Sequence, residues 1–90
     1  MTGIYCIENK INGKKYIGKA TDLLSRERQH FSKLSVGNHP CMEMQQDYNT
    51  YGASAFVFCI LEECNEEKLK HLEDYYILSN HSIGNLCNMS

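Results

Sequence analysis

An Asn12-Gly13 dipeptide lies between two short segments rich in residues that favour β-strands. Asn-Gly is favoured in tight hairpin turns, because both central residues of a type I′ turn need positive φ. The sequence therefore predicts two antiparallel strands, roughly residues 3–8 and 14–17, joined by a two-residue turn. Side chains alternate between the faces of a strand. The first strand then presents Ile4, Cys6 and Glu8 on one face and Tyr5, Ile7 and Asn9 on the other.

Length and composition fit one small domain with a packed core. The chain has 90 residues, of which 42% are hydrophobic and 10% aromatic. Its first residues lack the basic-then-apolar pattern of a signal peptide, and no apolar run approaches membrane-spanning length. These features predict a soluble, cytoplasmic protein that does not bind membranes, organised as a single domain over residues 1–90 with no additional DNA-binding domain.

The charges are divided unevenly along the chain. The formal net charge is −2, which argues against simple non-specific binding to nucleic acid. Residues 1–33, however, hold seven Lys or Arg and three acids, whereas residues 34–90 hold two Lys and eight acids. A basic N-terminal part can present a local phosphate-binding surface even when the whole chain is acidic.

Five cysteines occur at irregular spacing, without a C-x-x-C pair. An odd number in a chain without a secretion signal argues against a disulfide framework. Free, buried cysteines that act as small hydrophobic residues are the favoured interpretation. A zinc-stabilised binding domain stays open as an alternative, with four candidate ligands: His39, Cys41, Cys59 and Cys64.

The segment after the hairpin predicts an amphipathic helix over residues 23–34, with Thr21 or Asp22 as its N-cap. Arg26 and His30 are four residues apart, so they project from one face of this helix. A guanidinium can hold a phosphate with a planar fork of donors, and an imidazole can exchange a proton near neutral pH. Arg28 faces elsewhere on the helical wheel.

Three further elements follow along the chain. Residues 39–51 predict a second helix that Gly52 ends, and residues 54–62 form an apolar run that predicts a central strand covered on both faces. A third helix begins after Asn65, which can cap it. The fold class is therefore a small α/β (α+β) domain in the chain order ββααβα, with a three-stranded antiparallel sheet flanked by three helices.

Glu73 is the most unusual residue of the third helix. It falls inside the apolar stripe of that helix, which consists of Leu69, Leu72, Tyr76 and Ile77. A carboxylate on a buried face is costly unless a partner compensates it. A metal ion or a buried basic partner would explain Glu73, and so would a hydrogen bond to a tyrosine or arginine at the edge of the stripe.

The hairpin carries two tripeptides, Gly3-Ile4-Tyr5 and Tyr16-Ile17-Gly18, that resemble the motifs of the GIY-YIG nuclease family. The Arg26–His30 helix resembles the family's R-x-x-x-H helix, and the segment around Glu73 resembles its metal-binding glutamate segment. Further positions carried over by the resemblance are Lys19, His39 and Asn88, the last with Asn85 as a competing position.

The resemblance implies a metal-dependent DNA endonuclease that hydrolyses phosphodiester bonds. It implies one divalent ion, Mg²⁺ or Mn²⁺, held by Glu73, and charge neutralisation by Arg26. Either Tyr5 or Tyr16 would activate water, with help from His30 or Lys19. We expect the tyrosines, the arginine, the histidine and Glu73 to line one cleft, with Glu73 on the same side of the sheet as the tyrosines.

The resemblance also implies binding partners, and one alternative function stays open. DNA is the expected substrate, with a fused or separate DNA-targeting module beside the nuclease domain. The alternative is a catalytically inactive module that keeps the fold and binds nucleic acid or protein. Against this alternative stands the joint presence of five residues that a degenerate module would be expected to lose: Tyr5, Tyr16, Arg26, His30 and Glu73.

Overall fold

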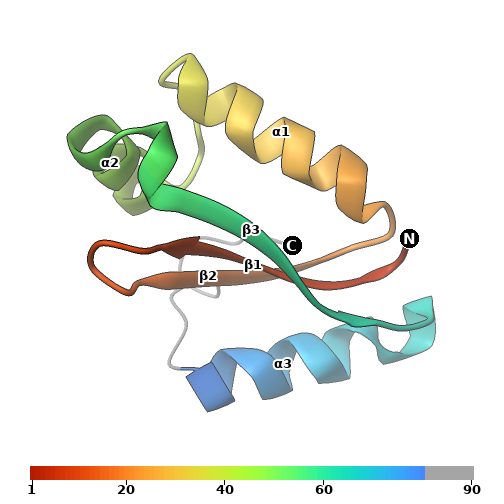
Figure 1. Ribbon diagram of the computed structural model, residues 1–90. Coiled ribbons are helices and arrows are strands. Elements are labelled where there is room, and N and C mark those ends of the chain that lie inside the picture. Colours follow the sequence, from red (N-terminus) through yellow and green to blue (C-terminus); the bar gives the residue numbers. More distant parts are fainter. Residues whose placement is uncertain (81–90) are drawn as a thin grey trace.

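The computed structural model describes residues 1–80 and confirms the predicted order of strands and helices (Figure 1). The elements are β1 (Gly3–Asn9), β2 (Lys15–Ala20), α1 (Leu23–Ser35), α2 (Met42–Tyr51), β3 (Phe56–Glu63) and α3 (Leu69–Asn80). Short 3₁₀ turns precede two of them, η1 (Ala53–Ala55) before β3 and η2 (Glu66–Lys68) before α3. No helix in residues 1–80 has the length and apolar character needed to cross a membrane.

The three strands form one antiparallel sheet in the order β2-β1-β3. Helices α1 and α2 lie on one side of this sheet and α3 lies on the other (Figure 1). Strand β1 is therefore covered on both faces, and six of its seven residues are buried. The prediction that residues 54–62 form the central strand is wrong, because β3 lies at an edge and Ile60 keeps 41% of its surface exposed.

The hairpin is confirmed, but its turn is longer than predicted. Asn9 N–H donates to the Lys14 carbonyl at 2.9 Å, and five residues, 10–14, rather than two connect the strands. The Asn9 and Asn12 side chains each accept a backbone N–H two residues further along, which stabilises the longer loop. Gly13 has a φ of 75°, a value that favours glycine.

The helix boundaries follow their caps. The Asp22 side chain accepts the Ser25 N–H at 3.2 Å, which confirms Asp22 as the N-cap of α1. Helix α2 begins at Met42, three residues later than predicted, with Cys41 as its N-cap. His39 therefore lies in the loop before α2. The Asn65 side chain caps the 3₁₀ turn that runs into α3, as predicted for the start of this helix.

Two apolar clusters lie on the two faces of the sheet, as the alternation in β1 predicts. Tyr5 and Ile7 belong to the cluster under α1 and α2, which also contains Tyr16, Leu23 and Met44. On the other face Ile4, Cys6 and Ile17 pack with Leu69 and with the stripe of α3. Both sets of side chains come from the same short hairpin, so one motif supplies the centre of both cores.

The cysteines differ from one another. Cys6, Cys59 and Cys64 are free thiols, and of these only Cys6 is buried. Cys41 is disulfide-bonded, so the prediction of free, buried cysteines is wrong for Cys41 and is wrong about burial for Cys59, which is exposed.

Candidate functional site

Tyr5 lies at the centre of the face that α1 and α2 cover, and Gly18 makes room for it. Tyr5 pairs with Gly18 across the hairpin. A Cβ atom on Gly18 would lie 2.5 Å from the Tyr5 hydroxyl oxygen, so the tyrosine ring extends across the glycine toward the outer edge of β2. On its other side the ring stacks on Phe58 of β3, with centroids 5.1 Å apart. The last glycine of the second tripeptide thus positions the tyrosine of the first.

Two histidines form a hydrogen-bonded series that starts at the Tyr5 hydroxyl. The Tyr5 oxygen lies 2.6 Å from Nε2 of His30, and Nδ1 of His30 lies 2.7 Å from Nε2 of His39. The two imidazole rings stack with centroids 5.0 Å apart. We call this series Tyr5–His30–His39 the histidine chain. It is buried throughout, since its three residues are at most 7% exposed.

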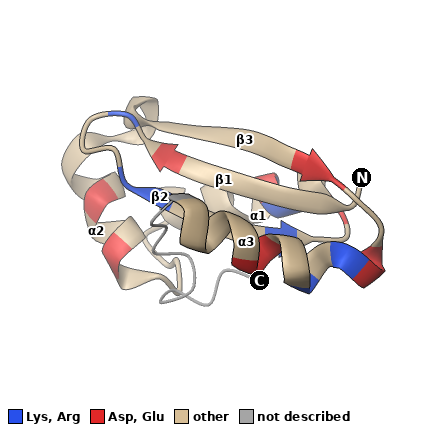
Figure 2. Ribbon diagram, turned by 90° about the horizontal axis from the view of Figure 1, so that it is seen from below, with Lys and Arg blue, Asp and Glu red and all other residues tan. Residues whose placement is uncertain are grey.

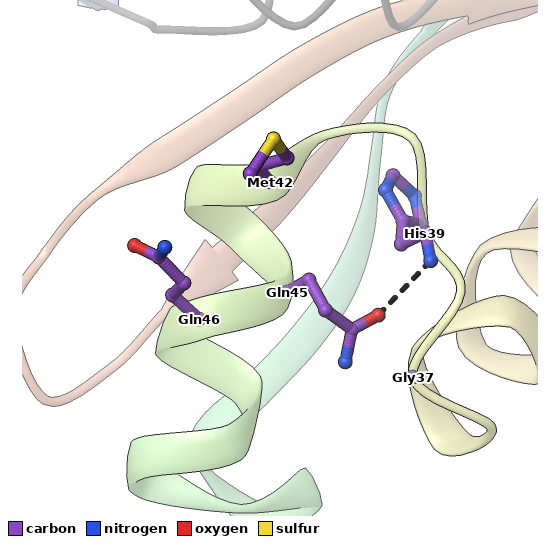
Figure 3. Close-up of a pocket in the computed structure, with 5 residues that line it drawn as sticks. All are labelled: Gly37, His39, Met42, Gln45 and Gln46. Carbon is purple, nitrogen blue, oxygen red and sulfur yellow. Dashed lines mark hydrogen bonds between the residues drawn. The ribbon is translucent and has the colours of Figure 1, made fainter.

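Gln45 of α2 holds the end of the histidine chain. The His39 backbone N–H donates to the Gln45 side-chain oxygen at 3.0 Å, as Figure 3 shows. The Gln45 amide nitrogen donates to the Leu34 carbonyl at the end of α1 and to the side chain of Asn49. Gln45 therefore ties the loop that carries His39 to both helices of this layer. His39 and Gln45 also line a small surface pocket with Gly37, Met42 and Gln46.

Burial keeps the histidine chain neutral. It lowers the pKa of His30 to about 3, with smaller contributions from His39 and from Arg26. It also lowers the pKa of His39. Neither imidazole carries a positive charge near neutral pH, so the two rings can lie in contact without repulsion.

Arg26 lies beside the Tyr5 hydroxyl, on the same face of α1 as His30. Burial raises the pKa of Tyr5 above its usual range, whereas the charge of Arg26 and a hydrogen bond from its side chain act in the opposite direction. Arg28 is exposed on another face of the helix. This geometry agrees with the helical wheel, which placed Arg26 and His30 together and Arg28 elsewhere.

Tyr16 points to a different group. Its buried hydroxyl donates to Asp47 of α2 at 3.2 Å, and Lys14 and Asn12 contact the same carboxylate. Burial, followed by the negative charge of Asp47, raises the pKa of Tyr16 above its usual range. The two motif tyrosines thus have opposite neighbours: a cation lies beside Tyr5, and an anion lies beside Tyr16.

Glu73 is buried, as the stripe of α3 predicts, and its partner is Lys19. The two charged atoms lie 3.4 Å apart, and the Glu73 side chain is 6% exposed. Because α3 packs against the opposite face of the sheet, the expectation that Glu73 shares one side with the tyrosines is wrong. The two sides meet instead at the edge of β2, where Lys19 follows Gly18 directly. Glu73 lies close enough that its charge contributes to raising the pKa of Tyr5.

Glu73 is the candidate ligand for a metal ion. Its carboxylate is buried and has one partly exposed partner, Lys19, at 3.4 Å, so oxygen lone pairs stay free to bind a hard cation. Such a cation often keeps water and substrate oxygens as its other ligands. Glu73 therefore fits such an ion. Within residues 1–80 no three or more His, Cys, Asp or Glu side chains gather as a metal-binding group, so His39, Cys41, Cys59 and Cys64 do not form the zinc site considered above.

Sequence reasoning missed Gln45 and Asp47. Both lie on α2, whose polar residues give no sign of which partners they meet. A buried glutamine such as Gln45 needs hydrogen-bond partners, yet its burial becomes visible only once α1 and α2 are packed. Asn88, the remaining predicted site residue, and its rival Asn85 lie outside the described residues.

An antiparallel sheet between two helical layers, with a tyrosine and two histidines hydrogen-bonded in its core, defines a small α+β domain with a polar site at one sheet edge. The sequence model of the GIY-YIG catalytic domain family matches residues 1–86 of this chain. The chain therefore belongs to the GIY-YIG family.

Individual relatives agree with this assignment. The chain is 40% identical over 67 residues to Intron-associated endonuclease 1 of Enterobacteria phage T4, a match that covers 74% of this chain and 27% of that protein. The fold resembles the solved catalytic domain of the homing endonuclease I-TevI, with a TM-score of 0.83, 31% identity and coverage of 90% and 89% of the two chains. A variant of that domain with a glutamate replaced by alanine gives a TM-score of 0.82 at 32% identity, covering 91% and 86%.

The chain thus spans about a quarter of the length of the curated relative, since the match covers 27% of that protein.

Proposed function

We propose that this chain is a divalent-metal-dependent endonuclease domain that hydrolyses phosphodiester bonds in DNA. The observation that carries the proposal is the position of the Tyr5 hydroxyl. Its oxygen lies 2.6 Å from Nε2 of His30 and takes part in a hydrogen bond with Arg26, and the charge of Glu73, which pairs with Lys19 of β2 on the other face, also acts on it. A phenol and a guanidinium thus lie together on one face of the sheet, a carboxylate lies on the other face beside β2, and these groups match the needs of phosphodiester hydrolysis.

Tyr5, rather than Tyr16, is the better candidate to activate water. Loss of a proton from a phenol creates a negative charge, which a neighbouring cation favours and a neighbouring anion opposes. Arg26 supplies the cation beside Tyr5, whereas Asp47 supplies an anion beside Tyr16. Tyr16 then has a structural part in the proposal, because its hydrogen bond to Asp47 joins the hairpin to α2.

Arg26 and Lys19 supply positive charge for the phosphate. A guanidinium can donate two parallel hydrogen bonds to phosphate oxygens, and it stabilises the additional negative charge of the transition state. Lys19 is partly exposed at the edge of β2, where it can contact the phosphate while it pairs with Glu73. His30 and His39 hold the Tyr5 hydroxyl in place.

Glu73 would hold the divalent ion, for which we propose Mg²⁺, with Mn²⁺ as a substitute. When bound, such an ion supplies charge neutralisation on the phosphate and on the leaving oxygen. One carboxylate is enough for this purpose, because magnesium at phosphate sites is usually bound through one or two carboxylates and keeps several waters.

We further propose that DNA is delivered with the help of another segment or protein. Lysines lie on the hairpin, on β2 and on the α3 layer, and acidic residues lie at the ends of β1 and β3, along α2 and on the α3 layer (Figure 2). This mixed surface, with a net charge of −2, predicts weak affinity of residues 1–90 for DNA. A DNA-targeting module, fused or separate, would raise the local concentration of substrate.

A plasmid cleavage assay tests the function. Supercoiled plasmid is incubated with the purified chain, with and without Mg²⁺ or Mn²⁺, beside two isosteric variants. Glu73→Gln removes the buried carboxylate, and Asp74→Asn removes the adjacent acid, which is exposed and pairs with Lys70. We expect metal-dependent nicking or linearisation by the parent and by Asp74→Asn, and none by Glu73→Gln.

A second readout concerns the metal alone. Water-proton relaxation with Mn²⁺ measures ion binding without any DNA, and we expect Glu73→Gln to lose the binding that Asp74→Asn retains. Cleavage that is unchanged in the presence of excess EDTA would contradict the metal dependence. DNA binding by a folded parent without any cleavage would favour the inactive module instead.

A further inference from the structure

One hydrogen bond to the histidine chain comes from a backbone N–H, a group that can act only as a donor. The backbone N–H of Cys41 donates to Nδ1 of His39 at 3.0 Å. A backbone amide can only donate at its nitrogen, so Nδ1 of His39 is an acceptor and carries no proton. His39 is therefore neutral, and its single ring proton is on Nε2.

This proton determines the state of the next ring. Nε2 of His39 lies 2.7 Å from Nδ1 of His30, and because the former carries the proton, the latter is the acceptor. His30 is then also neutral, with its proton on Nε2. That nitrogen lies 2.6 Å from the Tyr5 oxygen, so His30 donates and Tyr5 accepts. The lowered pKa values of both histidines agree with two neutral rings.

We propose that the backbone N–H of Cys41 sets the direction of the entire histidine chain, and that His39 is a positioning residue that makes His30 a hydrogen-bond donor to the Tyr5 oxygen. The proposal deepens the proposed function, on which its catalytic meaning rests. It has one chemical consequence. His30 Nε2 already carries a proton and cannot take the proton of Tyr5, so the Tyr5 proton is directed away from His30.

The same direction acts against burial, which raises the pKa of Tyr5. A donor that faces a phenol oxygen stabilises the phenolate more than the phenol, and His30 Nε2–H is such a donor. Together with Arg26, it gives the Tyr5 oxygen two donors. Gln45 contributes indirectly, because its bond to the His39 backbone holds the loop in which Cys41 N–H and His39 Nδ1 face each other.

Imidazole tautomers can be observed directly by NMR. Long-range ¹⁵N–¹H correlation spectra of the ¹⁵N-labelled chain distinguish protonated from unprotonated ring nitrogens. At pH 7 we expect His30 and His39 each to show a protonated Nε2 and an unprotonated Nδ1. A protonated Nδ1 on either residue would overturn the proposal, and this measurement needs no variant, substrate or metal.

A pair of variants tests whether Cys41 N–H is the cause. Cys41→Pro removes the N–H, and the φ of −83° at this position is close to the proline value. Cys41→Ala keeps the N–H. Both lack the sulfur, so loss of the disulfide and of the α2 cap is common to the two proteins. We expect Cys41→Ala to keep both Nε2–H tautomers and Cys41→Pro to show a protonated Nδ1 on His39.

Single-turnover cleavage adds the functional readout. We expect Cys41→Pro to cleave roughly tenfold or more slowly than Cys41→Ala, because a histidine held in the wrong tautomer fails to support its partner. Unchanged tautomers in folded Cys41→Pro would overturn the role of the N–H. If Cys41→Pro does not fold, the parent spectrum decides. The expected tautomers in a parent that does not cleave DNA would refute the proposed function while the hydrogen-bond direction stands.

Discussion

The two faces of the sheet are built differently, although the same hairpin supplies both. Under α1 and α2 the core contains a tyrosine hydroxyl and two neutral imidazoles, joined by hydrogen bonds of 2.6 and 2.7 Å. Under α3 the core formed by residues 1–80 is apolar except for one carboxylate, Glu73, which pairs with Lys19 at 3.4 Å. Hydrogen bonds between side chains compensate the buried polar groups on the first face, and a single ion pair compensates the buried carboxylate on the second.

The difference lies in how strictly each face constrains its side chains, since the larger apolar cluster shares its face with the polar network. Buried polar networks have strict geometry, because each member must find its partner. Apolar side chains such as Leu69 have no such requirement, and they supply burial free energy with little directional constraint. The two faces are closest in sequence at β2, where Gly18 lies under the Tyr5 ring and the next residue, Lys19, pairs with Glu73 on the other face.

The largest expected effect comes from the α1 side. Arg26→Ala should slow single-turnover cleavage roughly 100- to 1,000-fold, because it removes charge stabilisation in the transition state. Arg28→Ala, on the exposed face of the same helix, should leave the rate at saturating protein nearly unchanged. Arg26→Lys should recover little activity, since a point charge cannot replace the planar fork. Equal losses in the two alanine variants would refute the assignment of Arg26.

A leucine of α3 tests how much the apolar cluster on that side contributes to stability. Leu69→Ala should lower the free energy of unfolding by about 2–5 kcal/mol, as truncation of a buried leucine does. Leu78→Ala on the same helix is the control, because this side chain is 77% exposed and should change stability by less than about 0.5 kcal/mol. Urea denaturation measures both. Similar losses would show that the stripe of α3 has been assigned to the wrong face.

Gly18 leaves the space that the Tyr5 hydroxyl occupies. Two glycine variants can distinguish this role from a general effect of replacing a glycine in the hairpin. Gly18→Ala should lower stability by about 1–3 kcal/mol and also slow cleavage, because the new methyl group displaces the Tyr5 hydroxyl. Gly13→Ala, at a turn with φ 75° and open space around it, should cost about 1 kcal/mol and leave cleavage intact. Cleavage that is normal in Gly18→Ala would argue against a role for the exact position of Tyr5.

The last expected effect is a pH dependence of stability that the histidine chain causes. The pKa of His30 falls from 6.5 to about 3 on folding, so the unfolded state binds more protons between these values. Stability is therefore fully present above pH 6.5 and declines as the pH falls toward 3, with a slope of up to about 1.4 kcal/mol per pH unit for one proton. Urea titrations at pH 7 and pH 5 should show this loss, and His30→Gln should reduce it. A pH slope that His30→Gln leaves unchanged would assign the effect to other groups.

Several features of the fold were accessible from local patterns. Alternation in the first strand placed Tyr5 and Ile4 on opposite faces, and helical spacing placed Arg26 with His30 and Glu73 within its stripe. Asp22 and Asn65 were recognisable as caps, since their side chains bond backbone groups only three residues away. Each of these inferences depends on neighbours in the sequence, whose geometry a regular element fixes.

Other features required the assembled layers. An apolar run such as residues 56–63 has the same composition at the edge of a sheet as in its centre, so the position of β3 depends on which strand pairs with which. The Tyr16 hydroxyl bonds Asp47, which lies 31 residues away, so no local pattern in the sequence indicates this partner. The partner of Glu73 lies 54 residues away in the sequence, on a strand that shares no pattern with α3.

By itself the sequence determined the element order, the two faces of the hairpin and the family motifs, because alternation, helical spacing and capping act over a few residues. Only the tertiary structure decided that α3 lies opposite the tyrosines, that Gly18 gives Tyr5 its path to the edge of β2, and that Cys41 N–H faces His39. These facts depend on packing between distant segments, and the direction of a hydrogen bond follows from which two atoms that packing brings together.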